Sequence, residues 1–417
     1  MAVAALAACG GGGGNSSPNG APVAGSVGES GGSSTTGETG SAPPTAGGPG
    51  LVAQAPVRVN TTTAGNQFVR AIGALADGGY TVAWTSPAGS GAASSSFYIQ
   101  RYDAVGNKAG AQTLIPFQFD NGAVPALTVM GDGSVVLAYA AGRTPSPLEP
   151  WMTSTGIYTR RFDAGGAAVG AETVVVSRVF NSIGDQGLHY FTNPAVVSWA
   201  DGSYAVGWAY VEGNYTGVVP SFATQRYDAQ GQAAGGPQFS IGSGGADVLP
   251  TFRMTAAAGG SFVFAISSRN LNRQPAFFHF SGGGRIGSFD GDTALPWDQT
   301  ILLPLRDGRF ALWSTNSSGP YLQMLDARGQ AVGAATAVAA RPTRATALRD
   351  GGYLLVFDPQ GTAQRYDSAS AAVGQPFMPS PWGETTALSG GGLATAWTGT
   401  SAAGDQEAMT QRFLPPN

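Results

Sequence analysis

The sequence predicts an all-β fold, a seven-bladed β-propeller built from four-stranded antiparallel blades. Three observations support this prediction. A motif of the form QRYDAxG recurs along the chain, and a second motif, a turn followed by alternating apolar residues, falls between its copies. Helical periodicity is almost absent. Repeats of this kind, each providing four short strands, are typical of propellers.

The first motif supplies the third strand of each blade and the turn that follows it. Clear copies begin at Gln100 (QRYDAVG), Arg160 (RRFDAGG), Gln225 (QRYDAQG), Gln323 (QMLDARG) and Gln364 (QRYDSAS), with a truncated copy at Gln411 and a weaker one around His279. These seven copies predict seven blades.

The second motif supplies the hairpin between the first and second strands. Full copies begin at Asp77, Asp132, Asp201, Asp307 and Asp350, and degenerate copies begin at Gly259 and Gly390. An Asp-Gly pair between alternating apolar runs is a strong hairpin signal. In the first copy, Tyr80, Val82 and Trp84 share one face of the strand that follows the turn. This motif also occurs seven times, in agreement with the first.

The segment 56–60 is predicted to close the ring. The seventh repeat stops at Phe413 without a fourth strand, whereas Pro56 to Asn60 resembles the fourth strands elsewhere and has no repeat of its own. We expect this N-terminal strand to complete the C-terminal blade, because the exchange removes two open sheet edges. The propeller domain is therefore predicted over 56–417.

The repeated polar residues are predicted to be structural. Arg101, Arg161, Arg226 and Arg365 each precede an aspartate by two residues, on the same face of a strand. A functional site needs a unique constellation, whereas this pair returns in blade after blade. We expect ion pairs between blades or hydrogen bonds within turns. The recurring aromatic residues are expected to fill the space between blades.

The net charge of the chain argues against two classes of partner. It is −4, and Lys108 is the single lysine. The sequence therefore lacks the basic surface that nucleic acids or anionic membranes require. No apolar run reaches the length of about eighteen residues that a transmembrane helix needs, so no such helix is predicted.

The N-terminus resembles a bacterial lipoprotein signal. Leu6, Ala7 and Ala8 precede Cys9, as in a lipobox of the L-A-A-C type. The resemblance implies a signal remnant over 1–9, lipidation of Cys9 and a location in the cell envelope, with Gly10 after the cysteine favouring the outer membrane. The alternative is a chance cysteine in an Ala- and Gly-rich segment. Residues 10–55 are mostly Gly, Ser, Thr, Ala and Pro, which predicts a disordered tether.

Variation in loop length predicts which face of the disc carries the function. The turns between first and second strands, and between third and fourth strands, are uniformly short and share one face. Long second-to-third loops are expected at 85–96, 140–156, 209–222 and 398–408, and a long connection between blades is expected at 177–193. These segments belong to blades 7, 1, 2 and 3. Because function on a rigid scaffold is carried by variable loops, we expect a binding site there.

The candidate ligand-binding residues combine aromatic rings with carboxylates. They are Glu149, Trp151, Asp185, His189, Tyr190, Tyr210, Glu212 and Tyr215. Such a set suits stacking against a sugar or contact with a peptide, although aromatic residues also pack large loops onto their own blades. No catalytic triad and no metal-ligand spacing accompanies them, so no catalytic residue, metal or cofactor is predicted.

Non-catalytic binding is therefore the expected function. We expect a monomeric, lipid-anchored protein that binds an envelope protein or glycan through the face with the long loops. One alternative is an enzyme acting on polysaccharides or glycosides, with Glu149, Asp185 and Glu212 as its carboxylates. A purely structural surface repeat is a third possibility, because a fold does not determine a function.

Overall fold

The computed structural model describes residues 51–61, 65–87, 94–120, 125–143, 152–181, 188–214, 217–241, 251–257, 260–267, 276–281, 284–290, 301–316, 318–328, 330–338, 340, 342–357, 362–377, 383–401 and 404–415.

These residues form seven antiparallel sheets that follow one another along the chain. The first three sheets are β3 (Phe68–Ala74), β4 (Tyr80–Pro87), β5 (Ser94–Tyr102) and β6 (Thr113–Asp120); β7 (Ala126–Val129), β8 (Val135–Arg143), β9 (Met152–Phe162) and β10 (Ala168–Asn181); and β11 (Leu188–Ser198), β12 (Tyr204–Asn214), β13 (Gly217–Tyr227) and β14 (Gln238–Ile241).

The next three are β15 (Thr251–Ala256), β16 (Phe262–Ser267), β17 (Ala276–Ser281) and β18 (Gly284–Asp290); β19 (Ile301–Pro304), β20 (Phe310–Asn316), β21 (Gly319–Leu325) and β22 (Ala331–Ala337); and β23 (Pro342–Ala347), β24 (Tyr353–Phe357), β25 (Thr362–Tyr366) and β26 (Ala372–Phe377). The seventh contains β27 (Glu384–Ala387), β28 (Leu393–Thr400) and β29 (Gln406–Leu414), together with the short strands β1 (Val52–Ala53) and β2 (Val57–Arg58).

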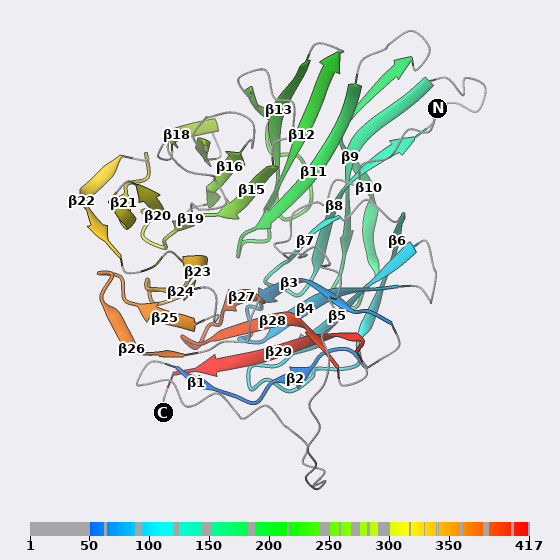
Figure 1. The fold of residues 1–417 in the computed structure, drawn as a ribbon. Coiled ribbons are helices and arrows are strands. Elements are labelled where there is room, and N and C mark those ends of the chain that lie inside the picture. The colour runs from blue at the N-terminus through cyan, green and yellow to red at the C-terminus, as the bar shows by residue number, and fades with distance from the viewer. Residues whose placement is uncertain are drawn as a thin grey trace, which may run out of the picture.

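The first strands of the sheets form a closed ring. Each of β3, β7, β11, β15, β19, β23 and β27 contacts the next, and β27 returns to contact β3. Figure 1 shows the sheets arranged around this ring in chain order, with the first blade in blue and the last in red. The predicted seven-bladed propeller of four-stranded antiparallel blades is confirmed.

Ring closure by the N-terminal strand is also confirmed, with an earlier start than predicted. In β2, Val57 pairs with Thr410 of β29, as expected from 56–60. However, β1 extends the pairing, since Val52 lies opposite Leu414. Residues 51–55 were predicted as tether but belong to the blade, because Leu51 is 2% exposed in an apolar cluster and the N–H of Gln54 donates to the carbonyl of Arg412.

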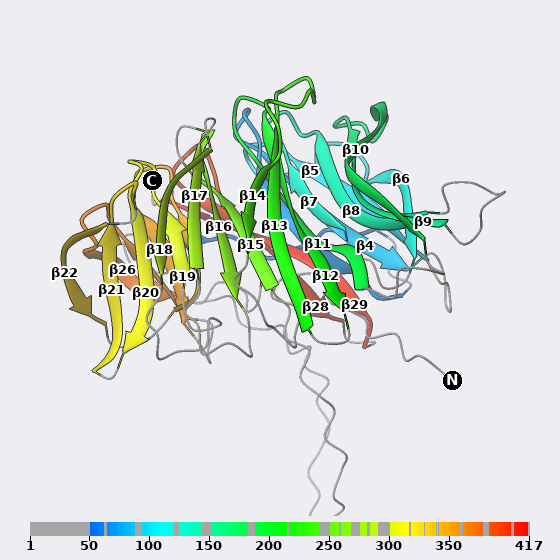
Figure 2. The ribbon, with the colours of Figure 1, turned by 90° about the horizontal axis from the view of Figure 1, so that it is seen from above.

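The long loops predicted in blades 2 and 3 are largely strand. β8 continues to Arg143 and β9 begins at Met152, while β10 and β11 occupy most of 177–193. β12 and β13 continue almost to the tip of their hairpin, where Asn214 pairs with Gly217. These strands run for 11 to 14 residues, against 5 residues for β24 and β25, so the two blades extend beyond the others. Figure 2 shows the long green strands of blade 3 from above.

The repeated aspartates stabilise turns. Asp201 Oδ1 accepts hydrogen bonds from the backbone N–H and the hydroxyl of Ser203 in a first-to-second turn. Asp103 Oδ1 accepts the N–H groups of Val105 and Asn107 in a third-to-fourth turn. The structural role predicted for these carboxylates is thus confirmed in the form of turn bonds.

Within the part of the chain that the structure describes, two of the repeated arginines form ion pairs inside their own blades, where pairs between blades were one of the expectations. Arg101 pairs with Asp77 of its own blade at 2.5 Å, and Arg365 pairs with Asp350 in the same way. Where an arginine does cross to the next blade, its described partner is a carbonyl or a ring. Arg412 Nη2 donates to the carbonyl of Ala104 at 2.6 Å. A carbonyl suits this position because the turn aspartates already accept backbone N–H groups.

Acid should destabilise the protein through these turns. The Gly79 N–H and then the Arg101 guanidinium hold the pKa of Asp77 below 3.8, and the Ser203 hydroxyl and N–H lower the pKa of Asp201 in the same way. A lowered pKa in the folded state stabilises the protein above the unfolded value, and this contribution is lost as pH falls through the folded value. We expect the urea midpoint of the protein to decrease as the pH is lowered below about 4. The decrease should be smaller in the variant Asp77→Asn/Asp201→Asn. An equally steep fall in that variant would contradict this assignment.

Gly106 should be the least replaceable glycine of its turn. Its φ is 93°, and a Cβ there would lie 2.6 Å from Arg412 Nη1 of the neighbouring blade. Gly110 has a similar φ of 83° but open space around it. We expect Gly106→Ala to lower the free energy of unfolding by about 3 kcal/mol and Gly110→Ala by about 1 kcal/mol. Urea unfolding measures both, and equal losses would show that the arginine contact costs nothing.

Candidate functional site

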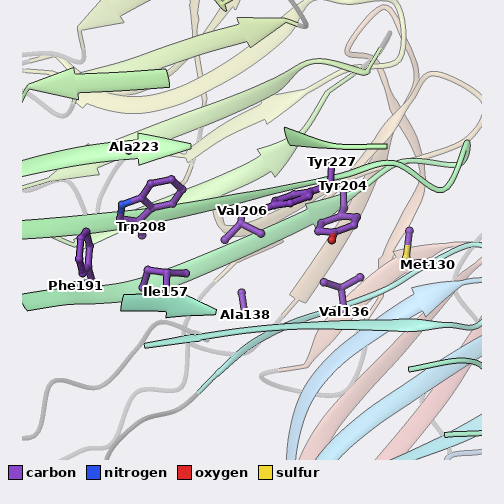
Figure 3. Close-up of a cluster of buried hydrophobic side chains, with 10 residues drawn as sticks. All are labelled: Met130, Val136, Ala138, Ile157, Phe191, Tyr204, Val206, Trp208, Ala223 and Tyr227. Carbon is purple, nitrogen blue, oxygen red and sulfur yellow. The ribbon is translucent and has the colours of Figure 1, made fainter. Parts of the chain in front are cut away.

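The extended strands of blades 2 and 3 rest on a continuous apolar interface. Its buried residues are Met130, Val136, Ala138, Ile157, Phe191, Tyr204, Val206, Trp208, Ala223 and Tyr227. Figure 3 shows these side chains between the two blades, with Trp208, Phe191 and Ile157 close together at one end. The alternation of β8 and β12 places these residues toward the neighbouring blade, so the interface holds the two extensions in a fixed relation.

An exposed arginine stacks on an aromatic pair at this extension. The guanidinium of Arg178 in β10 lies 5.4 Å from the ring centroid of Tyr210 in β12 and donates a hydrogen bond to its hydroxyl. The Tyr210 ring contacts Phe191 of β11 at 4.8 Å between centroids. The N–H of Phe191 donates in turn to the Thr155 hydroxyl of blade 2 at 3.4 Å. Side chains from both blades are therefore ordered around Tyr210.

β10 also carries a hydrogen-bonded carboxylate, that of Glu172. Glu172 accepts a hydrogen bond from the Tyr139 hydroxyl, and Tyr139 is buried at 7% exposure. Neither Arg178 nor Glu172 is among the residues predicted from the sequence. The sequence gives little indication that these two residues are functional, because single charged residues in a strand are usually solvated. Only the packing of blade 2 against blade 3 brings Arg178 of β10 onto the ring of Tyr210 in β12.

One candidate residue has a described side chain in this cluster. Tyr210 is half-buried and makes the contacts given above. His189, Tyr190 and Glu212 lie in β11 and β12, where the register makes His189 and Glu212 Cα partners. The predicted site residues that lie outside the described ranges are Cys9, Glu149, Trp151, Asp185 and Tyr215. The eight candidates thus stay a prediction, with Tyr210 alone placed in a side-chain cluster.

The described residues contain neither a metal-binding cluster nor a membrane-spanning helix. No group of three or more His, Cys, Asp or Glu side chains is arranged to hold a metal ion. No helix among these residues has the length and apolar character to cross a membrane.

Comparison with known proteins adds solved structures of low similarity. A protein of unknown function from Dyadobacter fermentans is 13% identical, with a TM-score of 0.43, and the match covers 88% of this chain and 100% of that one. The WD40 domain of Toxoplasma gondii coronin is 10% identical, with a TM-score of 0.44 and 89% and 88% covered. A mutant of the NanB sialidase from Streptococcus pneumoniae is 9% identical, with a TM-score of 0.38 and 86% and 70% covered. No family profile and no curated protein matches the chain.

The class of protein follows from the chain's own sheet order. Seven consecutive antiparallel sheets among the described residues, joined in a ring of first strands and closed by β1 and β2, define a β-propeller. Propellers with this architecture serve as enzymes and as binding scaffolds, so the site and not the fold has to indicate the function.

Proposed function

We propose that this propeller is a non-catalytic binding scaffold whose binding surface lies on the extended strands of blades 2 and 3. The observation that carries the proposal is the cluster of Arg178, Tyr210 and Phe191 at the point where these blades exceed the others. Arginine and aromatic residues are enriched at binding interfaces, and an arginine held on a ring loses little side-chain entropy when a partner binds. The expected partner is a protein or a glycan of the cell envelope.

The experiment is a binding screen with the full chain. Purified protein is tested against envelope polysaccharides and against an envelope protein extract, in separate arms that distinguish the two partners. Arg178→Ala/Tyr210→Ala is the site variant, and Arg328→Ala is the control because Arg328 is exposed in a turn on the opposite face of the disc. We expect the site variant to bind at least about tenfold more weakly, while its melting temperature stays within a few degrees.

Two results would overturn the proposal. One is binding by the site variant with the affinity of the original protein. The other is an equal loss of affinity in Arg328→Ala, which would move the binding surface to the face of the short turns.

The proposal also includes a lipid anchor on Cys9, supported by the lipobox resemblance and by the Gly-rich segment that follows it. An acylated cysteine with a flexible tether would hold the propeller near a membrane surface. We expect Cys9→Ser to move the protein from the membrane fraction to the soluble fraction, as measured by detergent phase partition. Retention of the variant in the membrane fraction would contradict lipidation at Cys9.

A further inference from the structure

The residue that precedes the aspartate of each first-to-second turn, here called the turn-entry residue, lies where neighbouring blades meet. In blades 1 and 2 the turn-entry residues are Ala76 and Gly131, and the N–H of Ala76 donates to the carbonyl of Gly131 at 2.7 Å. Each turn follows a first strand, and the first strands form the ring. The turn-entry residues therefore surround one end of the ring.

Two neighbouring blades carry arginine at this position. From blade 1 to blade 7 the turn-entry residues are Ala76, Gly131, Ala200, Ala258, Arg306, Arg349 and Ser389. Five blades thus have a small uncharged residue there, so the turn does not require arginine in order to form. The arginines of blades 5 and 6 are a local departure from the repeat, and such a departure is what a site needs.

The packing of blades 5 and 6 brings the two arginines to the same part of the ring. Strands β19 and β23, which lead into the two turns, contact each other (Figure 1). Leu305, directly before Arg306, is 2% exposed and belongs to the apolar cluster against which Ala347 packs, two residues before Arg349. Both arginines are themselves exposed, so a ligand can reach them from solvent.

The two guanidinium groups are close enough to act on each other. Partial desolvation, and after it the positive charge of Arg306, lower the pKa of Arg349 below its usual value. Like charges near each other repel, and this repulsion remains unless an anion neutralises it.

No carboxylate neutralises this pair within the part of the chain that the structure describes, where neither guanidinium has an ion pair or a hydrogen bond. The aspartates that follow the two arginines are bound elsewhere. Asp307 pairs with Arg309 at 2.7 Å. Asp350 pairs with Arg365 and accepts the N–H of Gly352 at 3.0 Å.

Blade 7, the next blade around the ring, adds no negative charge to this end. Its turn carries Gly390 in place of the aspartate. At the other end of β23, by contrast, Arg344 has Glu384 of blade 7 within 3.7 Å. The neighbouring blade thus provides a carboxylate for Arg344 and none for Arg349.

We propose that Arg306 and Arg349 together bind a tetrahedral oxyanion with two negative charges, either free phosphate or the phosphate group of an ester. A guanidinium group donates paired hydrogen bonds to such oxygens, and two of these groups match a dianion in charge. Binding would also remove the repulsion within the pair. The site lies on the face opposite the extended strands of blades 2 and 3 and does not rest on the function proposed for them.

The first test titrates the full chain into phosphate at low ionic strength and follows the phosphorus resonance by NMR. We expect a dissociation constant on the order of 1 mM. In Arg306→Gln/Arg349→Gln, binding should weaken more than about tenfold. Arg328→Gln is the matched control, because it removes one exposed arginine from another turn of blade 5 on the same face, and it should bind within about twofold of the original protein.

A parallel arm with glucose 6-phosphate separates the two sources of the anion. If this ester binds at least as tightly as phosphate, the ligand is a phosphate ester, and if phosphate alone binds, the ligand is the free anion. The proposal is overturned if neither compound binds at ~10 mM, or if the double variant binds as tightly as Arg328→Gln.

The second test uses thermal unfolding. At 10 mM phosphate the melting temperature of the original protein should rise by about 2 °C above its value in sodium chloride of equal ionic strength, because the folded state alone holds the pair together. Arg306→Gln/Arg349→Gln should lose this rise, and Arg328→Gln should keep it. An equal rise in all three proteins would show a general effect of phosphate on folding and would overturn the proposal.

Discussion

Deleting residues 51–60 should destabilise the propeller by more than about 5 kcal/mol, a large part of the free energy of unfolding of an ordinary domain. The deletion removes the buried side chains of Leu51 and Val59, at 2% and 0% exposure. It also removes the hydrogen bonds from Gln54 N–H to Arg412 and from Val59 N–H to Ala408. β29 would become an open edge available for pairing with other chains. We therefore expect a lower urea midpoint and a new aggregate peak in size-exclusion chromatography.

Point variants separate the buried part of this segment from its exposed part. Val59→Ala should cost about 2 kcal/mol, because the side chain is fully buried between blades 7 and 1. Val57→Ala is the matched control, since Val57 is 41% exposed, and its effect should stay within about 0.5 kcal/mol. If the chain that lacks residues 51–60 unfolded at the same urea midpoint as the full chain, the N-terminal strand would not close the ring.

Trp208→Ala should cost about 4 kcal/mol. Trp208 is 1% exposed in the interface between blades 2 and 3, so its removal leaves a cavity that β-sheets on both sides cannot easily fill. The measurement is urea unfolding followed by circular dichroism. Leu114→Ala is the control, because Leu114 is 50% exposed and should contribute less than about 0.5 kcal/mol.

The same substitution connects stability to the proposed binding surface. Trp208 and Phe191 belong to one cluster, and Phe191 supports Tyr210. We expect Trp208→Ala to weaken partner binding as well as folding. If Trp208→Ala lowered the free energy of unfolding by less than about 1 kcal/mol, the interface would have repacked, and the extensions of blades 2 and 3 would not depend on Trp208.

The blades could be predicted from the sequence because their signals are local. An Asp-Gly turn, such as that at Asp77, and a strand with alternating apolar residues lie within ten residues of each other. Because the motif is repeated, an irregular copy can be assigned by comparison with the regular ones. Closure could be predicted because the fourth strand missing after Phe413 matched a strand before the first repeat.

The extensions of blades 2 and 3 were harder to predict because their strands lack alternation. The segment from Tyr210 to Phe222 contains glycines, a proline and polar residues instead of regularly alternating apolar ones. Such a segment resembles a loop until its partner strands are known. The start of β1 was hidden for a related reason, since Leu51 and Val52 are isolated apolar residues beside a Gly-rich segment.

The contacts between neighbouring repeats could not be predicted from single motif copies. Arg306 and Arg349 are visible in the sequence as departures from the small residues that other blades carry before the turn. Their proximity appears only when the turns of neighbouring blades are seen to meet, as Ala76 and Gly131 do. A contact between residues of different blades cannot be inferred from one motif copy. Departures from a repeat therefore become informative once the structure shows which residues of neighbouring repeats meet.

We propose that the extended strands of blades 2 and 3 form the binding surface. Hydrogen exchange of the full chain, with and without the envelope partner retained in the screen, tests it most directly. We expect slower exchange on binding in 174–181, 188–195 and 208–214, which contain Arg178, Phe191 and Tyr210. Slower exchange confined to the turns at 103–107, 163–167 and 228–232, on the opposite face, would contradict it.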